Sequence, residues 1–514
     1  MHGWIQECER NHPVCRLTAK PFKPTRLIDV GTQDAPEVKL ETEGIPGLRY
    51  VALSHCWGPP DPERPILKTE SSTITEREKG IPLNIMPKNF RDAILVTRRL
   101  GLQYLWIDSL CIIQDSVEDW RREAAMMDQV YIHAYVTLAA TSTSTSHDGF
   151  LERPLKEEVR VPFVSQKDGS VHGHIYLRQV MDNRPCKYET NVECSKWNDR
   201  GWTLQERFLS RRLVHFCRDQ SYFECRSAIW AEDNHKIQHL PTPTSIADQA
   251  GSQNGAETEN KWDDKHGYND KIERIFEHWF HIVAQFSARQ LTYGADKLPA
   301  LSGLAKETSS AGPVGRYLAG IWEEDLAYGL LWICCANDHE FSSAPSYRAP
   351  SWSWASMDGQ ITWGSQWERN ALPQTFELLQ ADIKLAGNDP FGSITCAHLV
   401  VAGLLLPVNI NGFAQTKLSI FDFPYQLIHE GKKIGFSHLD LRRPEYVARS
   451  LFALQLFEQW PRLPEHGQQH VWCGLILEPS LGPAKTFRRV GLFFLDEEHL
   501  DVFQSVESSR ITLV

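Results

Sequence analysis

The sequence contains no apolar run long enough to cross a membrane. A membrane helix needs about 20 predominantly apolar residues, and the best candidate, 326–333, is preceded directly by Glu323, Glu324 and Asp325. The N-terminus also lacks a basic region followed by an apolar stretch, which is the pattern of a secretion signal. We therefore expect a cytoplasmic protein with no membrane span.

An excess of basic residues is missing as well. The chain has 54 Lys and Arg against 65 Asp and Glu, which gives a net charge of -11. Because binding to phosphate backbones requires concentrated Lys and Arg, we expect no nucleic-acid partner. The 12 cysteines are dispersed, as at Cys334 and Cys335, rather than grouped in a dense disulfide framework. This distribution is typical of a reducing compartment.

The sequence lacks the common nucleotide-binding motifs and the nucleophile motif of serine hydrolases. The chain has neither the glycine-rich turn of a Rossmann domain nor a P-loop, so we expect no bound nucleotide cofactor. It also lacks the Gly-x-Ser-x-Gly sequence of an α/β-hydrolase nucleophile. The sequence therefore argues against serine hydrolase chemistry.

The chain is long enough for more than one domain. Its 514 residues exceed what a single hydrophobic core normally organises. We expect five segments: an N-terminal extension at 1–48, an α/β domain at 49–230, a flexible polar insertion at 231–268, a helical region at 269–345 and an antiparallel, β-rich C-terminal domain at 346–514.

The stretch 104–114 is the centre of the predicted α/β domain. Its apolar residues, bounded by Gly101 and by polar residues after Gln114, predict a buried strand. Asp108 lies inside this run, where an unpaired carboxylate would be costly. It therefore either caps a neighbouring element or belongs to a functional site.

Strand and helix patterns alternate around this stretch. Apolar residues predict strands at 50–54 and 135–141, and helical spacing predicts helices at 87–101 and 116–134. Alternation of this kind is typical of a parallel sheet with helices on both faces. The carboxyl ends of such strands share one edge, where ligands bind.

Polar and aromatic residues follow the first of these strands. Ser54, His55 and Trp57 come directly at its predicted carboxyl end. His55 next to Cys56 could be a Cys/His nucleophile pair, but adjacent residues of a strand point to opposite faces. We favour a packed strand end.

A short amphipathic helix is predicted at 200–212, and a hairpin at 213–225 follows it. Trp202 and Glu206 are four residues apart and share a face of this helix. Glu206 has two interpretations: a functional carboxylate, or a surface carboxylate that pairs with Arg200 or Arg207.

Cys8, His12 and Cys15 lie within two helical turns of the predicted N-terminal extension. They could supply three ligands to zinc, but structural zinc sites normally have four, and the sequence shows no fourth. A packed N-terminal helix without a metal is the favoured interpretation.

Four ordered motifs resemble the heterokaryon-incompatibility (HET) domain of filamentous fungi. They are Leu53–Gly58, Tyr104–Gln114, Met127–Ala134 and Arg200–Glu206. Further stretches at 298–304, 319–322 and 348–356 resemble the region that commonly follows this domain. The resemblance implies a role in fungal allorecognition, in which fusion of incompatible cells triggers programmed cell death.

A second resemblance, to TIR domains, bears on chemistry. Leu53-Ser54-His55 is similar to the Ile-Ser-Tyr sequence of TIR domains, and Trp202 with Glu206 has the spacing of their Trp-Cys-x-x-Glu motif, with Thr203 in place of the cysteine. The glutamate is catalytic in TIR domains that cleave NAD. This resemblance implies a flavodoxin/TIR-like sheet and NAD as a substrate rather than a cofactor.

These observations give a set of candidate site residues. A carboxylate beside the ribose would stabilise the oxocarbenium-like state of glycosidic cleavage, and a tryptophan would stack on the nicotinamide. The predicted catalytic residues are Glu206, which would be that carboxylate, and Asp108. The predicted substrate-binding residues are Ser54, His55, Trp57, Gly58, Cys111, Gln114, Trp202 and Gln205.

A competing hypothesis needs no catalysis. The same domain could be a signalling module that acts through protein partners or self-assembly, and no sequence feature separates the two hypotheses. Both predict an intracellular protein that uses no metal or cofactor.

Overall fold

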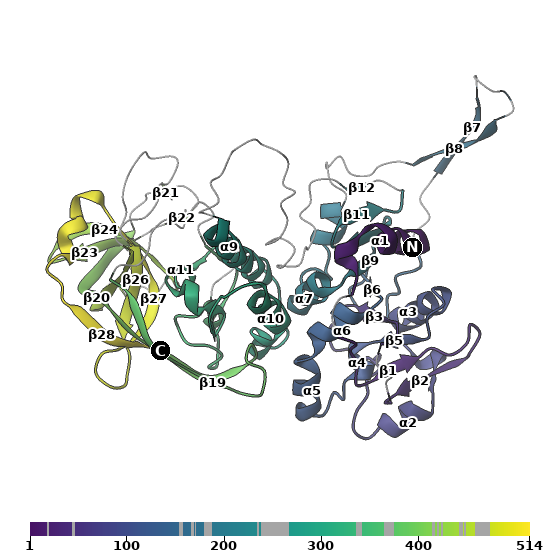
Figure 1. Cartoon of the computed structure of the whole chain (residues 1–514), viewed down its shortest axis with the longest axis horizontal. Coiled ribbons are helices and arrows are strands. Elements are labelled where there is room, and N and C mark those ends of the chain that lie inside the picture. Colours follow the sequence, from purple (N-terminus) through teal and green to yellow (C-terminus); the bar gives the residue numbers. More distant parts are fainter. Residues whose placement is uncertain are drawn as a thin grey trace. The chain divides into compact units, whose positions relative to one another are not determined.

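The structure is a computed structural model of the whole chain (Figure 1). It describes residues 1–17, 20–43, 47–153, 158–165, 169, 171–178, 188–233, 236–237, 267–335, 342–363, 375–413, 417–418, 421–422, 425–441, 446, 449–457 and 473–514. The chain divides into two compact units. Unit 1 comprises 1–123 and 129–243, and unit 2 comprises 124–128 and 244–514.

A ten-stranded sheet forms the centre of unit 1, in the order β12-β11-β10-β9-β6-β3-β5-β1-β2-β4 (Figure 1). Its strands are β1 (Leu27–Asp29), β2 (Glu37–Glu41), β3 (Tyr50–Ser54), β4 (Ile81–Pro82), β5 (Tyr104–Trp106), β6 (Val136–Ala139), β9 (Arg212–Phe216), β10 (Ser221–Cys225), β11 (Ala228–Ala231) and β12 (Lys236–Ile237).

The sheet is mixed rather than parallel throughout. β3 pairs in parallel with β5 and β6, and β6 pairs in parallel with β9. All other pairs in this sheet are antiparallel. The predicted α/β pattern is therefore confirmed for the four central strands, and the hairpin predicted at 213–225 is β9 with β10. Every residue of β3 and β6 is buried.

The α-helices described between residues 1 and 209 accompany these strands. They are α1 (His2–Asn11), α2 (Ile74–Lys79), α3 (Lys88–Arg99), α4 (Asp108–Cys111), α5 (Val117–Ala124), α6 (Met127–His133) and α7 (Gly201–Leu209). The last residue of α5 and the first two of α6 belong to unit 2. The helix predicted at 87–101 is α3. Phe90, Ala93, Ile94 and Thr97 are buried, as the helical spacing of its apolar residues predicted.

Two predicted elements of unit 1 are wrong in extent. The strand predicted at 104–114 stops at Trp106, because Asp108 begins the short helix α4 and its Oδ1 accepts the Ser109 amide at 2.7 Å. The helix predicted at 116–134 is two helices, α5 and α6, separated at 125–126. The hydrogen bond from the Ser109 amide to Asp108 is typical of helix starts, where short polar side chains accept from free backbone N–H groups.

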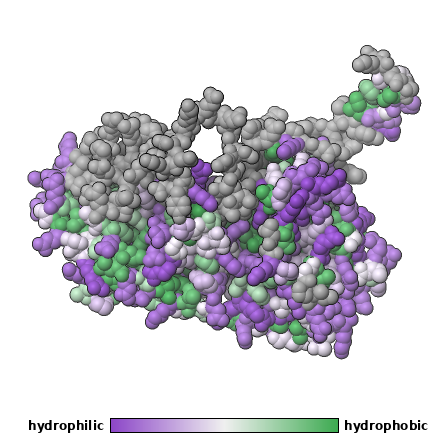
Figure 2. Space-filling view, in the orientation of Figure 1, coloured by the Kyte–Doolittle hydropathy of each residue, from purple (hydrophilic) through white to green (hydrophobic). Residues whose placement is uncertain are grey.

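A two-stranded hairpin, β7 (Glu158–Val164) with β8 (His172–Arg178), carries exposed apolar side chains. Those with the largest exposed fractions are Val159, Phe163, Val164, Val171 and Ile175. Figure 2 shows hydrophobic residues on this hairpin, whereas the rest of the visible surface of unit 1 is mostly hydrophilic. The flexible insertion predicted at 231–268 lies almost wholly outside the described residues, which include β12 within it.

Helices occur in the region 269–345, as predicted, but short strand pairs that were not predicted accompany them. The helices are α9 (Gly267–Ser287), α10 (Ser302–Ala311) and α11 (Leu326–Gly329). The short pairs are β13 (Tyr317–Leu318) with β14 (Ile321–Trp322), β15 (Ile333–Cys334) with β18 (Ile361–Thr362), β16 (Ser342–Ser343) with β17 (Met357–Asp358), and β21 (Lys417–Leu418) with β22 (Phe421–Asp422).

An eight-stranded sheet forms the rest of unit 2 and confirms the predicted antiparallel, β-rich region. Its strands are β19 (Glu377–Leu385), β20 (Ile394–Phe413), β23 (Tyr425–His429), β24 (Lys432–Leu439), β25 (Leu451–Phe457), β26 (Cys473–Pro479), β27 (Thr486–Leu495) and β28 (Ser508–Leu513). Among the strand pairs that the structure describes in this sheet, β27 and β28 are parallel and the others are antiparallel. Aliphatic and aromatic side chains of these strands form its core.

None of the described helices combines the length and apolarity that crossing a membrane requires.

Candidate functional site

Ser54 and Glu206 are in direct contact inside unit 1. Ser54 is the last residue of β3, and Glu206 lies in the second half of α7. The Ser54 hydroxyl donates a hydrogen bond to Glu206 Oε2, and Trp197 Nε1 donates to Ser54 Oγ at 2.6 Å. Ser54 is 1% exposed and Glu206 is 4% exposed. The carboxyl group therefore lies below the surface.

Burial raises the pKa of Glu206 to about 7, although the positive charge of Arg200 and the hydrogen bond from Ser54 act to lower it. The nearby Asp108 charge acts in the opposite direction and raises this pKa further. A hydrogen bond with Tyr131 also lowers it. Near neutral pH this carboxyl group can therefore both hold and release a proton.

Asp108 is the more accessible of the two carboxylates. It is half-buried at the start of α4, and Trp57 Nε1 donates to its Oδ2 at 2.8 Å. Gln114 Nε2 donates to the Asp108 backbone carbonyl at 3.2 Å, which connects the two ends of the segment 108–114. Lys68 Nζ lies 5.4 Å from the centre of the Trp57 ring. The tryptophan is thus held by a hydrogen bond at its ring nitrogen and by a cation near its ring face.

The two contacts share one short segment of the chain. Ser54, which contacts Glu206, and Trp57, which contacts Asp108, are three residues apart. β3 and β5 pair in parallel, so the residues that follow them lie at one edge of the sheet. Trp202 is half-buried, with its ring edge-on to Trp120 at 6.4 Å.

His55 and Cys56 show none of the geometry of a nucleophile pair. Both ring nitrogens of buried His55 lack a hydrogen-bond partner within the described structure, and the ring packs edge-on against Phe90 at 5.3 Å. Burial lowers the pKa of His55 to about 4 and raises the pKa of Cys56. The packed strand end that we favoured from the sequence agrees with these contacts.

Three other candidate residues have contacts that account for them by packing. Cys111 is fully buried, and burial raises the pKa of its thiol to about 12. Gly58 has φ of +88°, and a Cβ there would approach Thr145 Cβ within 2.8 Å. Gln205 is buried within α7. A direct role of these three in substrate binding remains a prediction.

The surface interpretation of Glu206 is wrong, since its carboxyl is buried. The neighbouring Arg207 contacts other carboxylates: Nε lies 3.1 Å from Glu224 Oε1 and Nη2 lies 2.9 Å from Glu193 Oε1. His215 Nε2 lies 2.7 Å from Glu224 Oε2. Interaction with Arg207 and His215 outweighs burial and lowers the pKa of Glu224 to about 2.

Sequence reasoning missed two residues that contact this site. Trp197 precedes α7 in a polar segment, where its sequence neighbours give no sign that it bonds to Ser54. Tyr131 falls within the helix predicted at 116–134 from the spacing of its apolar face, and its hydroxyl interacts with Glu206. The polar end of a tyrosine within such a face was the one available signal.

A separate group of side chains in unit 1 has the composition of a metal site. The ligand atoms of Cys8, His12, Cys15 and Cys225 all lie within 4.8 Å of one another. The sequence showed no fourth ligand because Cys225 ends β10, far along the chain from α1.

Comparisons with known proteins identify part of the chain. Residues 50–206 match the family model described as Heterokaryon incompatibility protein (HET). The matched range begins at the first residue of β3 and ends at Glu206. No curated protein and no solved structure was found to match the chain.

Proposed function

We propose that this chain, whose residues 50–206 form a HET domain, takes part in heterokaryon incompatibility by hydrolysing NAD at the nicotinamide glycosidic bond. The family match supports the biological role. The chemical step is our inference from the pair of carboxyl groups at the edge of the sheet.

The observation that carries the proposal is the environment of Glu206. Its carboxyl group is held by Ser54 at the end of β3, has a pKa of about 7 and interacts with the Asp108 charge. Carboxyl groups with raised pKa values beside a second carboxylate are typical of sites that move protons.

The proposed reaction needs one carboxylate near the ribose and one proton acceptor. The bond between ribose C1′ and the nicotinamide nitrogen breaks, and neutral nicotinamide leaves with the bonding electron pair. Asp108, which is partly exposed, stabilises the oxocarbenium-like ribose. Water adds to C1′, and its proton passes to the Glu206 carboxylate. Trp57 offers an aromatic face for the departing ring.

Because Glu206 is only 4% exposed, substrate can reach it only if the site opens. We expect self-assembly or a partner protein to favour the open state, so that dilute protein is less active per molecule than concentrated protein. This expectation follows from the general coupling between binding and conformational populations.

The burial of Glu206 also favours a second candidate function. A non-catalytic HET domain that signals through protein contacts would need no accessible carboxyl group, and Glu206 would then only organise the contact between α7 and β3. This alternative predicts that NAD is untouched when the protein acts.

Expression in fungal cells separates the two functions. We expect the parent protein to deplete cellular NAD before viability falls, and Glu206→Gln to abolish both effects at equal protein level. Glu118→Gln is the matched control, because Glu118 is an exposed glutamate of the same domain. Cell death that proceeds with unchanged NAD would support the non-catalytic function instead.

A further inference from the structure

We propose that Cys8, His12, Cys15 and Cys225 bind one structural zinc ion that fastens the N-terminal segment to the β10–β11 hairpin. This inference is independent of the proposed function, since the four residues include none of the candidate catalytic residues. Three of them precede the matched HET range and the fourth follows it.

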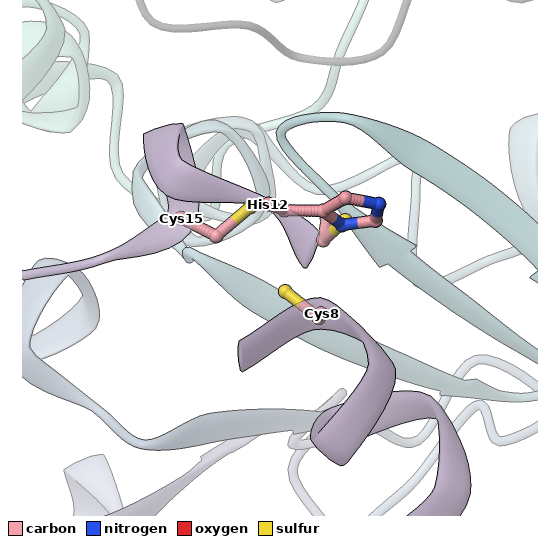
Figure 3. A group of neighbouring side chains, drawn as sticks. Cys8, His12 and Cys15 are labelled. Atoms are coloured by element: carbon pink, nitrogen blue, oxygen red, sulfur yellow. The ribbon is translucent and has the colours of Figure 1, made fainter. Parts of the chain in front are cut away.

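Local structure brings three of the four residues together. Cys8 lies in the last turn of α1, and His12 follows the helix end with its amide bonded to the Cys8 carbonyl at 3.0 Å. A 3₁₀ turn, Pro13–Cys15, then returns the chain so that Cys15 faces the same point. Figure 3 shows the side chains of Cys8, His12 and Cys15 converging.

The fourth residue comes from the sheet. Cys225 is the last residue of β10, and its Sγ lies 3.3 Å from His12 Nδ1. All four ligand atoms lie within 4.8 Å of one another. In a tetrahedral zinc site with Zn–S near 2.3 Å and Zn–N near 2.1 Å, ligand atoms are about 3.6 to 3.8 Å apart. Side-chain adjustments of about 1 Å or less would close the group around one ion.

The chemistry of the group selects zinc. Three thiolates and one imidazole form a soft, borderline donor set, and four protein ligands leave no open position for water or substrate. Such closed sites are structural rather than catalytic. The three thiols are 0 to 2% exposed, so the ion would be shielded from solvent.

Neighbouring side chains are placed to support thiolate ligands. Arg212 Nε donates to Cys8 Sγ at 3.3 Å, and the Ser227 hydroxyl lies 4.0 Å from Cys15 Sγ. The positive charge of Arg212 offsets the net negative charge of a zinc ion with three thiolates. The His12 ring stacks on Trp230, with centroids 5.4 Å apart and planes 7° apart, which fixes its orientation. Outer contacts of this kind commonly orient metal ligands.

The zinc ion would attach α1, which has few buried side chains, to the sheet of unit 1. Only Ile5 and Cys8 are buried on α1, and a helix of this length has little stability by itself. One ring contact, Trp4 against Phe223 at 5.9 Å, also joins α1 to β10. A bound ion would link three ligands of the N-terminal segment to Cys225 of β10 across the same junction and close a long loop of the chain.

Metal analysis of the purified full-length protein, made without a histidine tag, tests the site. We expect about one zinc ion per chain in the parent protein. In Cys225→Ser we expect the zinc content per chain to fall by about tenfold or more. Cys217→Ala is the matched control, because Cys217 is a buried cysteine of unit 1 outside the group. It should keep its zinc.

A second measurement on the parent covers the case in which Cys225→Ser fails to fold. Alkylation by iodoacetamide should spare Cys8, Cys15 and Cys225 until a chelator removes the ion, and should then modify all three while Cys217 stays unmodified. Folded parent protein that holds no zinc after growth in zinc-supplemented medium would overturn the proposal. A mass showing a disulfide among the three thiols would overturn it as well.

Discussion

At the scale of single residues, Glu206 couples the candidate site to stability. Its pKa is about 7 in the folded protein against an ordinary value of 4.5. A carboxyl group whose pKa is higher in the folded state than in the unfolded state contributes to stability. This contribution is complete below the pKa of the unfolded state and is lost as the pH rises through the pKa of the folded state. Ionising Glu206 between about pH 4.5 and 7 therefore costs stability.

Glu206→Gln should remove this pH dependence. We expect the free energy of unfolding of the variant, relative to the parent, to rise by about 2 to 3 kcal/mol between about pH 5 and pH 8, because the amide cannot ionise. Urea unfolding at both pH values measures the difference, with Glu118→Gln as the exposed control. A constant difference between variant and parent would show that Glu206 titrates normally.

Glu224 presents the opposite case, a buried carboxylate that is paired in the folded state. Glu224→Ala would leave Arg207 and His215 without this partner in a buried position, and we expect a loss of about 3 kcal/mol in the free energy of unfolding. Glu232→Ala is a suitable control, since Glu232 forms a more exposed pair with Arg153. An equal loss in the free energy of unfolding in both variants would contradict the claim that the buried ion pair contributes more than the exposed one.

At the scale of elements, the C-terminal strand β28 joins two other strands. It pairs antiparallel with β20 and parallel with β27. Its Ile511 and Leu513 are 1% and 0% exposed. The strand thus closes one part of the core of unit 2.

Removing 508–514 should weaken unit 2 locally. The loss of two buried aliphatic side chains costs about 3 kcal/mol or more, since each contributes roughly 1.5 to 3 kcal/mol by burial. Hydrogen exchange should become faster in peptides from β20 and β27, while peptides from β3 in unit 1 serve as the internal reference. Unchanged exchange in β20 would show that β28 adds little to this sheet.

Elements with a strong local pattern could be predicted from the sequence. β3 and α3 were found because their apolar periods match a buried strand and an amphipathic helix. The strand at 104–114 was predicted too long because apolar composition does not show that Asp108 starts a helix. The hairpin of β9 and β10 was predicted, but the other antiparallel strands of this sheet, β1, β2, β4, β11 and β12, were missed, since short strands carry little periodic signal.

The candidate site could be predicted only in part for a related reason. Motif residues Ser54, Asp108 and Glu206 were identified from the sequence, but the partners Trp197 and Tyr131 were not. The interpretation of Glu206 as a surface carboxylate was wrong, because its burial depends on the packing of α7 against β3. Contacts between distant segments leave no local trace in a single sequence.

At the scale of the whole molecule, the match to the HET family model covers residues 50–206, and the structure describes helices and strands well beyond that range. The helical region and the β-rich region both belong to compact unit 2, whereas the candidate site lies in unit 1. The five predicted segments therefore stay a prediction at their finer boundaries.

Nicotinamide release from NAD by the purified full-length protein tests the central claim most directly. We expect release to increase more than proportionally with protein concentration, to rise with pH through about 7 as Glu206 ionises, and to be absent in Glu206→Gln. Glu118→Gln should match the parent. A folded, concentrated parent protein that releases no nicotinamide, or a Glu206→Gln variant that releases it at the parental rate, would contradict the account.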